Sequence, residues 1–140
     1  MTDLMELASR VEAGEGPDRD LDALIAPLQG LRVVDEGHPL GRCCYDVSRC
    51  VVRLPAYTAS LDAAMSLVPA GHTVQLSDWD HEVLREKGPW QAIVLPLGAR
   101  GAMQQFTFTN RCDHAATAPL ALTAAALRAR AHQGTAHVEQ

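Results

Sequence analysis

The chain has 140 residues, of which 47% are hydrophobic and 21% are charged, a balance typical of globular proteins and unlike that of disordered ones. Its formal net charge is −5, and its Lys and Arg residues are scattered along the sequence. Nucleic-acid binding depends on a dense basic face, because each phosphate contact releases a counterion, so we expect no nucleic-acid partner. The length suits one hydrophobic core, and we predict a single domain over residues 1–140.

The sequence predicts neither export nor membrane insertion. No apolar run reaches the ~20 residues that a membrane-spanning helix needs. The start of the chain, from Met1 to Leu4, lacks the basic and apolar regions of a signal peptide, so we expect a cytoplasmic protein. In that reducing compartment its cysteines are expected to be free thiols. They are Cys43, Cys44, Cys50 and Cys112.

Residues 1–30 predict an N-terminal helical segment with two helices. Asp3 is suited to cap the first helix. Its apolar stripe consists of Leu4, Leu7, Ala8 and Val11. Pro17 is expected to be the first residue of the second helix, where its missing N–H costs nothing. The stripe of the second helix consists of Leu21, Leu24, Ile25 and Leu28.

The middle of the chain predicts strands around one short helix. Residues 31–54 carry an imperfect strand pattern with a loop at residues 37–41, and strand patterns return at 73–76, 92–95 and 103–109. Gly98 and Gly101 favour a hairpin between the last two. Residues 77–89 are polar and predict a loop. Between the two groups of strands, Thr58 or Ser60 is expected to cap a helix. Its apolar stripe consists of Leu61, Ala64, Met65 and Val68.

The last predicted element is an Ala- and Leu-rich helix over residues 118–131 with Thr117 as its cap. Its main stripe is widened by further apolar positions, so the helix is expected to pack on more than one neighbour. The stripe and the widening positions are Leu120, Leu122, Ala124, Ala125, Leu127 and Ala131. Arg128, Arg130 and His132 are expected to complement the dipole at the helix end, and residues 133–140 are expected to form a frayed tail.

The order of the elements predicts an α+β fold. Successive strands lack a helix in every connection, which favours a mainly antiparallel sheet over a doubly wound parallel one. We expect helices to cover this sheet in a three-layer α-β-α sandwich, with the sheet and its helices over residues 31–132.

The cysteines are the first candidates for a metal site. Cys43, Cys44 and Cys50, with Cys112 and His114 in a predicted loop, include the residue types that bind zinc. The paired spacing of zinc sites is absent, and adjacent Cys43 and Cys44 point to opposite faces if extended. Because free cysteines are commonly buried as small apolar residues, we predict no metal and no cofactor.

Two further segments carry polar groups that could act in a site. The first is the loop 78–82, which gathers an aromatic ring with acid and base groups: Asp78, Trp79, Asp80, His81 and Glu82. No nucleophile or oxyanion hole accompanies them, and a solvated loop explains the charges. The second is the segment 57–60, where helix N–H groups could bind an anion, although capping alone explains Thr58 and Ser60. We therefore predict no catalytic residues.

Three segments together resemble the phage ABA-sandwich domain family, small proteins of phages, prophages and bacterial genomes. The segments are Gly16 to Asp22, Tyr57 to Pro69 and Ala116 to Arg130. The resemblance spans most of the chain as short motifs separated by variable strands. It implies a three-layer fold with helices on both faces of a sheet, and it implies no reaction and no assigned site residues.

The functional hypothesis is a phage- or prophage-type accessory domain without enzymatic activity that acts through protein contacts or self-association. Aromatic residues are only 4% of the chain, so Ala, Leu and Val must supply the core, and its margin of stability would gain from burying one more face. The alternative is a small-ligand- or metal-binding module, or a small enzyme, that uses the loop 78–82 with Cys112 and His114.

Overall fold

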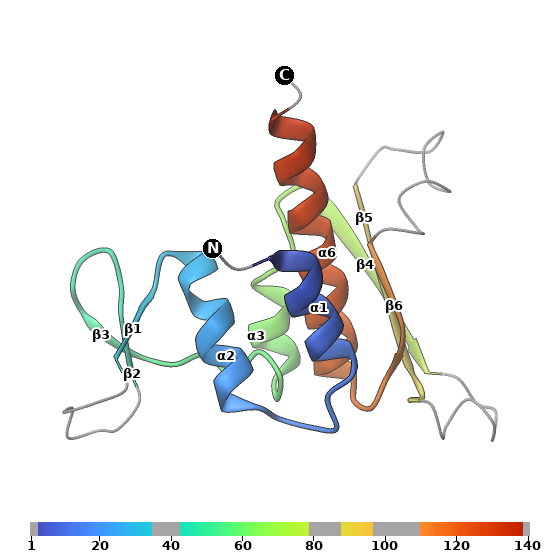
Figure 1. Cartoon of the computed structure of the whole chain (residues 1–140), viewed down its shortest axis with the longest axis horizontal. Helices are drawn as coiled ribbons and strands as arrows, with labels where there is room; N and C mark the ends of the chain where they lie inside the picture. The colour runs from blue at the N-terminus through green and yellow to red at the C-terminus, as the bar shows by residue number, and fades with distance from the viewer. Residues whose placement is uncertain (1–2, 35–42, 79–87, 97–109, 139–140) are drawn as a thin grey trace.

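The computed structural model describes residues 3–34, 43–78, 88–96 and 110–138, and its helices gather between two small sheets (Figure 1). The helices are α1 (Leu4–Glu12), α2 (Arg19–Ile25), the 3₁₀ helix η1 (Ala26–Gln29), α3 (Leu61–Met65) and α6 (Ala118–Val138). The strands are β1 (Arg32–Val34), β2 (Cys43–Tyr45), β3 (Val51–Arg53), β4 (His72–Asp78), β5 (Trp90–Pro96) and β6 (Arg111–Ala115).

The strands form two three-stranded sheets, ordered β1-β2-β3 and β4-β5-β6, and every described pairing is antiparallel. The predicted α+β class and its antiparallel pairing are therefore confirmed. The sequence predicted one sheet between two helix layers, whereas the strands divide into two sheets. The described helices that contact the second sheet, α1 and α6, lie on the same side of it (Figure 1). The three-layer arrangement stays a prediction.

Helix starts follow the capping chemistry of the sequence, with one shift of position. Asp3 caps α1, as predicted, by accepting a hydrogen bond from the backbone N–H of Met5. The second helix begins at Arg19 and not at Pro17, because the Asp18 carboxylate accepts from the N–H groups of Asp20 and Leu21. Ser60, one of the two predicted alternatives, caps α3.

Thr58, the other predicted cap, instead joins α2 to the segment before α3. Its backbone N–H and its hydroxyl both lie 2.9 Å from Oδ1 of Asp22, a fully buried carboxylate. Its hydroxyl oxygen also accepts from the N–H of Asp18 at 2.8 Å. Buried polar groups require such partners, so this cluster fixes α2 against residues 54–58.

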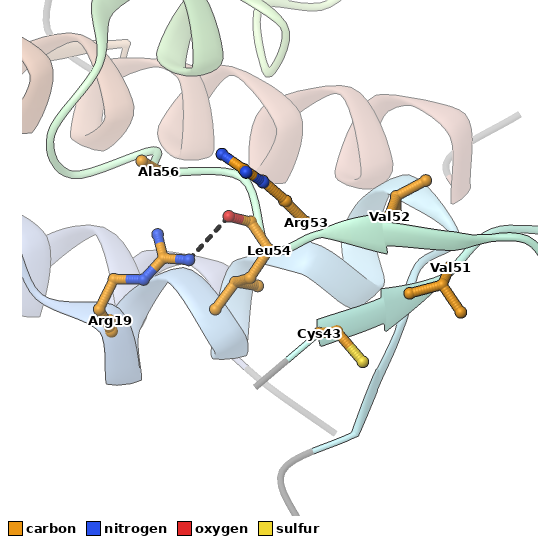
Figure 2. Close-up of a pocket in the computed structure, with 7 residues that line it drawn as sticks. All are labelled: Arg19, Cys43, Val51, Val52, Arg53, Leu54 and Ala56. Atoms are coloured by element: carbon orange, nitrogen blue, oxygen red, sulfur yellow. Dashed lines mark hydrogen bonds between the residues drawn. The ribbon is translucent and has the colours of Figure 1, made fainter. Parts of the chain in front are cut away.

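Arg19 extends the same connection to the first sheet. Its Nη1 donates to Oδ2 of Asp22 at 2.8 Å, and its Nη2 donates to the Leu54 carbonyl, just after β3, at 2.7 Å (Figure 2). One guanidinium therefore bridges α2 to the exit of β3. The planar fork of Arg suits such simultaneous bonds.

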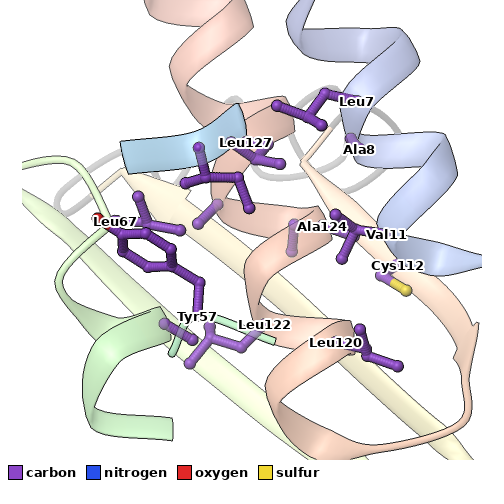
Figure 3. Close-up of a cluster of buried hydrophobic side chains, with 14 of the residues drawn as sticks. Leu7, Ala8, Val11, Tyr57, Leu67, Cys112, Leu120, Leu122, Ala124 and Leu127 are labelled. Atoms are coloured by element: carbon purple, nitrogen blue, oxygen red, sulfur yellow. The ribbon is translucent and has the colours of Figure 1, made fainter. Parts of the chain in front are cut away.

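The hydrophobic core is built around α6, whose residues from Leu120 to Leu127 are all buried. Figure 3 shows Leu7, Ala8 and Val11 of α1 packed beside Ala124 and Leu127, with Tyr57 and Leu67 on another side of the helix. The helix contacts α1, α3, β5 and β6, which confirms that it packs on more than one neighbour. Its alanines permit these close approaches, because they add little side-chain bulk.

The basic residues of α6 have a different role from the predicted one. The helix extends to Val138, so Arg128 and Arg130 do not lie in its last turn. Arg128 donates to Oε2 of Glu12 and to the Arg111 carbonyl, both at 2.7 Å, and Arg130 donates to the Leu67 carbonyl at 2.6 Å. Both side chains tie α6 to its neighbours, and the predicted dipole role is wrong for them.

Part of the predicted apolar stripes lies at the surface. Leu24 of α2 is 38% exposed, and Leu61 and Met65 of α3 are 41% and 47% exposed, although Ala64 between them is buried. The helix α3 is only five residues long, and the core position is taken by Leu67 just beyond its end. The α1 stripe, by contrast, packs on the core as predicted.

The second sheet contains a strand that the sequence did not predict. Cys112 and His114, expected in a loop, lie in β6, which pairs with β5, and the register shifts between Trp90 and Ala92. The predicted strands 73–76 and 92–95 lie within β4 and β5. The predicted strand 103–109 and the loop 37–41 lie outside the described residues.

No helix in the described part of the chain combines the length and the apolar character that crossing a membrane requires.

Candidate functional site

The predicted cysteine and histidine candidates do not come together. Cys43, Cys44 and Cys112 are buried, Cys50 is exposed, and all four are free thiols. Cys43 faces Arg53 across the sheet and its neighbour Cys44 faces Val52, so the two thiols point to opposite faces, as predicted. Among the residues that the structure describes, no group of three His, Cys, Asp or Glu side chains is arranged to hold a metal ion.

Cys112 belongs to a partly buried polar cluster between α1, β6 and α6. It shares a hydrogen bond with Glu12, whose carboxylate also accepts from Arg128 and from the N–H of Asp113. Burial raises the pKa of the Cys112 thiol well above its usual range, and the Glu12 carboxylate raises it further. Since the thiolate is the nucleophile and the metal ligand, a thiol that stays protonated at neutral pH is poorly suited to either role.

Glu12 is the charged centre of this cluster. Burial acts to raise its pKa, but the hydrogen bonds and positive charge of Arg128, with the hydrogen bonds from Cys112 and Asp113, lower it below its usual value. The carboxylate therefore stays ionised and paired at neutral pH. Each of these interactions holds one element against another, so the cluster has a structural explanation.

Of the other predicted candidates, the structure describes His114 and Asp78, which lie on different strands. His114 is half-buried on β6, and its Nδ1 atom is buried without a hydrogen-bond partner among the described residues. Asp78 is the exposed last residue of β4. Trp79, Asp80, His81 and Glu82 lie outside the described residues, so the convergence of this loop with Cys112 and His114 stays a prediction.

The segment 57–60 is occupied by structural contacts. Thr58 is bonded to Asp18 and Asp22, and Ser60 caps α3. The Tyr57 ring is buried, its hydroxyl donates to Gln29, and its carbonyl accepts from Thr123 at 2.9 Å. Burial raises the pKa of Tyr57 to about 12, so its phenol stays protonated. Capping and packing, and not anion binding, account for these residues.

A pocket of about 630 Å³ lies between α2 and the β2–β3 hairpin (Figure 2). The pocket combines two guanidinium groups with aliphatic side chains and one thiol. Its lining residues are Arg19, Cys43, Val51, Val52, Arg53, Leu54 and Ala56. Arg19 is held by Asp22 and the Leu54 carbonyl, whereas Arg53 extends from exposed strand β3 toward the segment that carries Ala56.

The first sheet presents a distinct face beside this pocket. Val33, Cys44 and Val52 pack against the core, so alternation places the neighbouring side chains on the opposite face. The antiparallel register groups them in two rows across the sheet. One row is Arg32, Tyr45 and Val51; the other is Val34, Cys43 and Arg53.

The hairpin that carries this face exposes aliphatic side chains. Val47, in the turn between β2 and β3, is 89% exposed, and Val51 is 45% exposed. The turn is held by Asp46, whose carboxylate accepts from the N–H groups of Ser48 and Cys50 at 2.9 Å, and Arg49 adopts a positive φ of 63°. The hairpin is therefore a defined structure, and in Figure 1 it projects from the helices.

Sequence reasoning did not identify the pocket. Arg19 stands among acidic residues near the start of the chain, and Arg53 ends a weak strand pattern. Their proximity depends on the packing of α2 against the end of β3, which no local pattern encodes.

Comparison of the chain with known protein families, with curated proteins and with solved structures gave no match.

Proposed function

We propose that this protein is a non-enzymatic accessory module of the phage or prophage type, which acts in the cytoplasm by contacting another protein or a second copy of itself. The observation that carries the proposal is the β2–β3 hairpin, which exposes Val47 and Val51 beside half-buried Tyr45. The resemblance to the phage ABA-sandwich family and its three-layer arrangement form part of the same proposal.

The exposure of these side chains supports a contact surface. Single apolar residues are common on protein surfaces, but this projecting hairpin carries two exposed valines, and Val51 lies opposite the Tyr45 ring across the sheet. In the described residues, β1 and β3 each pair only with β2, so both outer strands have an edge available to another chain. Adding a strand to such an edge is a common mode of protein recognition.

The state of the reactive groups also favours binding over catalysis. Burial keeps the thiol of Cys112 and the phenol of Tyr57 protonated at neutral pH, and the Glu12 carboxylate is occupied by Arg128. In the alternative enzyme or metal site, which uses the loop 78–82 with Cys112 and His114, the described thiol of Cys112 is protonated, and residues 79–82 lie outside the described part of the chain.

Site-specific photo-crosslinking tests the proposal. A benzophenone amino acid is placed at Val47 in the full chain, and the control carries it at Thr73, an exposed residue of β4. We expect crosslinked protein at position 47 and none at 73, and we expect Val51→Asp to reduce the product. Mass spectrometry of the product distinguishes a second copy from another protein. Equal crosslinking at the two positions, or none at Val47, would overturn the proposal.

A further inference from the structure

The pocket between α2 and β3 contains two guanidinium groups in different situations. Arg19 is fixed: its Nη1 bonds to Asp22 and its Nη2 to the Leu54 carbonyl. Arg53 is exposed at the end of β3 and forms no hydrogen bond or ion pair with the other described residues. One group is therefore positioned in advance, and the other can adjust to a ligand.

The charges around the pocket favour an anion. Arg19 and Arg53 contribute two positive charges, and the only carboxylate bonded to either of them in the described part of the chain is that of Asp22. Asp22 is fully buried and already accepts from Thr58 and Arg19, so among the described residues it balances at most one of these two positive charges. A guanidinium carries five N–H donors, and the described bonds of Arg19 use Nη1 and Nη2 but not Nε.

The remainder of the pocket favours a ligand with aliphatic groups. Val51, Val52 and Ala56 line it together with the arginines, and none of the described lining residues is aromatic. The pocket adjoins β3, an outer strand of the sheet in the described residues, and Pro55 follows that strand shortly after its end. An extended segment lying along β3 would place alternate side chains toward the pocket, because side chains on a strand alternate between faces.

We propose that this pocket binds a carboxylate side chain of an extended acidic segment in a partner protein, with the carboxylate between Arg19 and Arg53. Charge complementarity selects the acidic group, and the valines and Ala56 select an aliphatic neighbour. The inference rests on the proposed function, since it names the chemistry of the partner that contacts the hairpin.

Fluorescence anisotropy with a labelled peptide, Val-Glu-Val-Glu-Val-Glu, tests the pocket on the full chain. The control peptide has Gln at each Glu. The test variant is Arg53→Glu, and the matched control is Arg32→Glu, which makes the same charge change on the same face outside the pocket lining. We expect the Glu peptide to bind the unaltered protein and the Gln peptide to bind about tenfold more weakly, as the loss of charge-assisted hydrogen bonds implies.

The two variants locate the binding. Arg53→Glu is expected to lower the affinity for the Glu peptide about tenfold or more, and Arg32→Glu to lower that affinity less than about twofold. Both arginines are exposed, so circular dichroism and thermal unfolding are expected to show folded protein in each case. Equal binding of the two peptides, or equal losses in the two variants, would overturn the assignment of the pocket.

Two further measurements separate the possible sources of the carboxylate. Free glutarate that displaces the peptide at the same concentration as unlabelled peptide would overturn a protein segment in favour of a small acid. If light scattering detects a dimer that Arg53→Glu dissociates, the partner segment belongs to a second copy of the chain, and the proposal of a different partner protein is overturned. If crosslinking at Val47 succeeds while the peptide does not bind, the proposed function stands and the acidic segment is wrong.

Discussion

Replacing Asp22 with alanine is expected to destabilise the protein by about 1–3 kcal/mol, because a buried backbone donor loses its acceptor. The Asp22 side chain is fully buried and accepts from the Thr58 N–H, the Thr58 hydroxyl and Arg19 at 2.8–2.9 Å. These bonds join α2 to the segment between β3 and α3. Their loss therefore affects packing between elements that are distant in sequence.

The magnitude comes mainly from one of the three donors. The Thr58 N–H is buried, and an unsatisfied buried donor costs about 1–3 kcal/mol. The Thr58 hydroxyl lies 3.2 Å from the Asp18 carbonyl and keeps that possible acceptor. The Arg19 side chain is 48% exposed, so water replaces much of its lost ion pair, and this part contributes less than about 1 kcal/mol.

Urea denaturation followed by circular dichroism measures the change in the free energy of unfolding. Asp20→Ala, at an exposed position on the same helix, is the matched control and is expected to cost less than about 1 kcal/mol, because water screens the interactions of an exposed carboxylate. The loss of stability for Asp22→Asn is expected to lie between those of Asp22→Ala and Asp20→Ala, because its amide oxygen can still accept from Thr58. The reasoning is refuted if Asp22→Ala costs no more than Asp20→Ala.

Three other substitutions test separate parts of the fold. The folded pKa of Glu12 is lowered, so the stability that its carboxylate contributes is complete at neutral pH and is lost as the pH falls through and below about 4.5. Glu12→Gln should therefore lower the free energy of unfolding by about 1–3 kcal/mol at pH 7, and its unfolding curves should converge on those of the unaltered protein in acid. Gly88→Ala should lower the free energy of unfolding in urea by at least about 2 kcal/mol, because its Cβ would lie 2.8–2.9 Å from backbone atoms of β6 and its φ is +118°. Gly16→Ala, which has open space around it, should change that free energy by less than about 1 kcal/mol. Leu120→Ala should destabilise the protein by about 2–5 kcal/mol, because it leaves a cavity where this α6 side chain packs in the core. Leu24→Ala, at an exposed position, should cost less than about 1 kcal/mol, and similar losses for the two variants in calorimetry would contradict the assigned core.

The elements that the sequence predicted well have local signals. The stripe of α1 repeats at helical spacing after an Asp cap, and α6 is a long run of strong helix formers. Both signals act within one turn or one helix face. For the same reason Ser60 was among the predicted caps, and the second helix begins at Arg19, only two residues after the predicted start at Pro17.

The elements that the sequence did not predict depend on contacts between distant residues. Residues 111–115 lack a regular alternation because their register against β5 shifts, so Cys112 and Ala115 are buried three positions apart, which breaks the two-residue period of a strand. Leu61 and Met65 have helical spacing, but their exposure is decided by where the short α3 ends. The pocket needs Arg19 and Arg53 to meet across 34 positions of the sequence, and that pairing follows from tertiary packing alone.

The central position of α6 has a consequence for how the chain acquires its structure. This helix packs against α1, β5 and β6, so α1 emerges from the ribosome long before the surface that it covers. Contacts between α1 and α6 join residues such as Glu12 and Arg128, which are 116 positions apart. Separations of this kind slow folding, because the long loop must close before the contact stabilises it. We expect nascent chains that end before residue 118 to leave the apolar side of α1 uncovered, and so to depend on chaperones until the last helix is made.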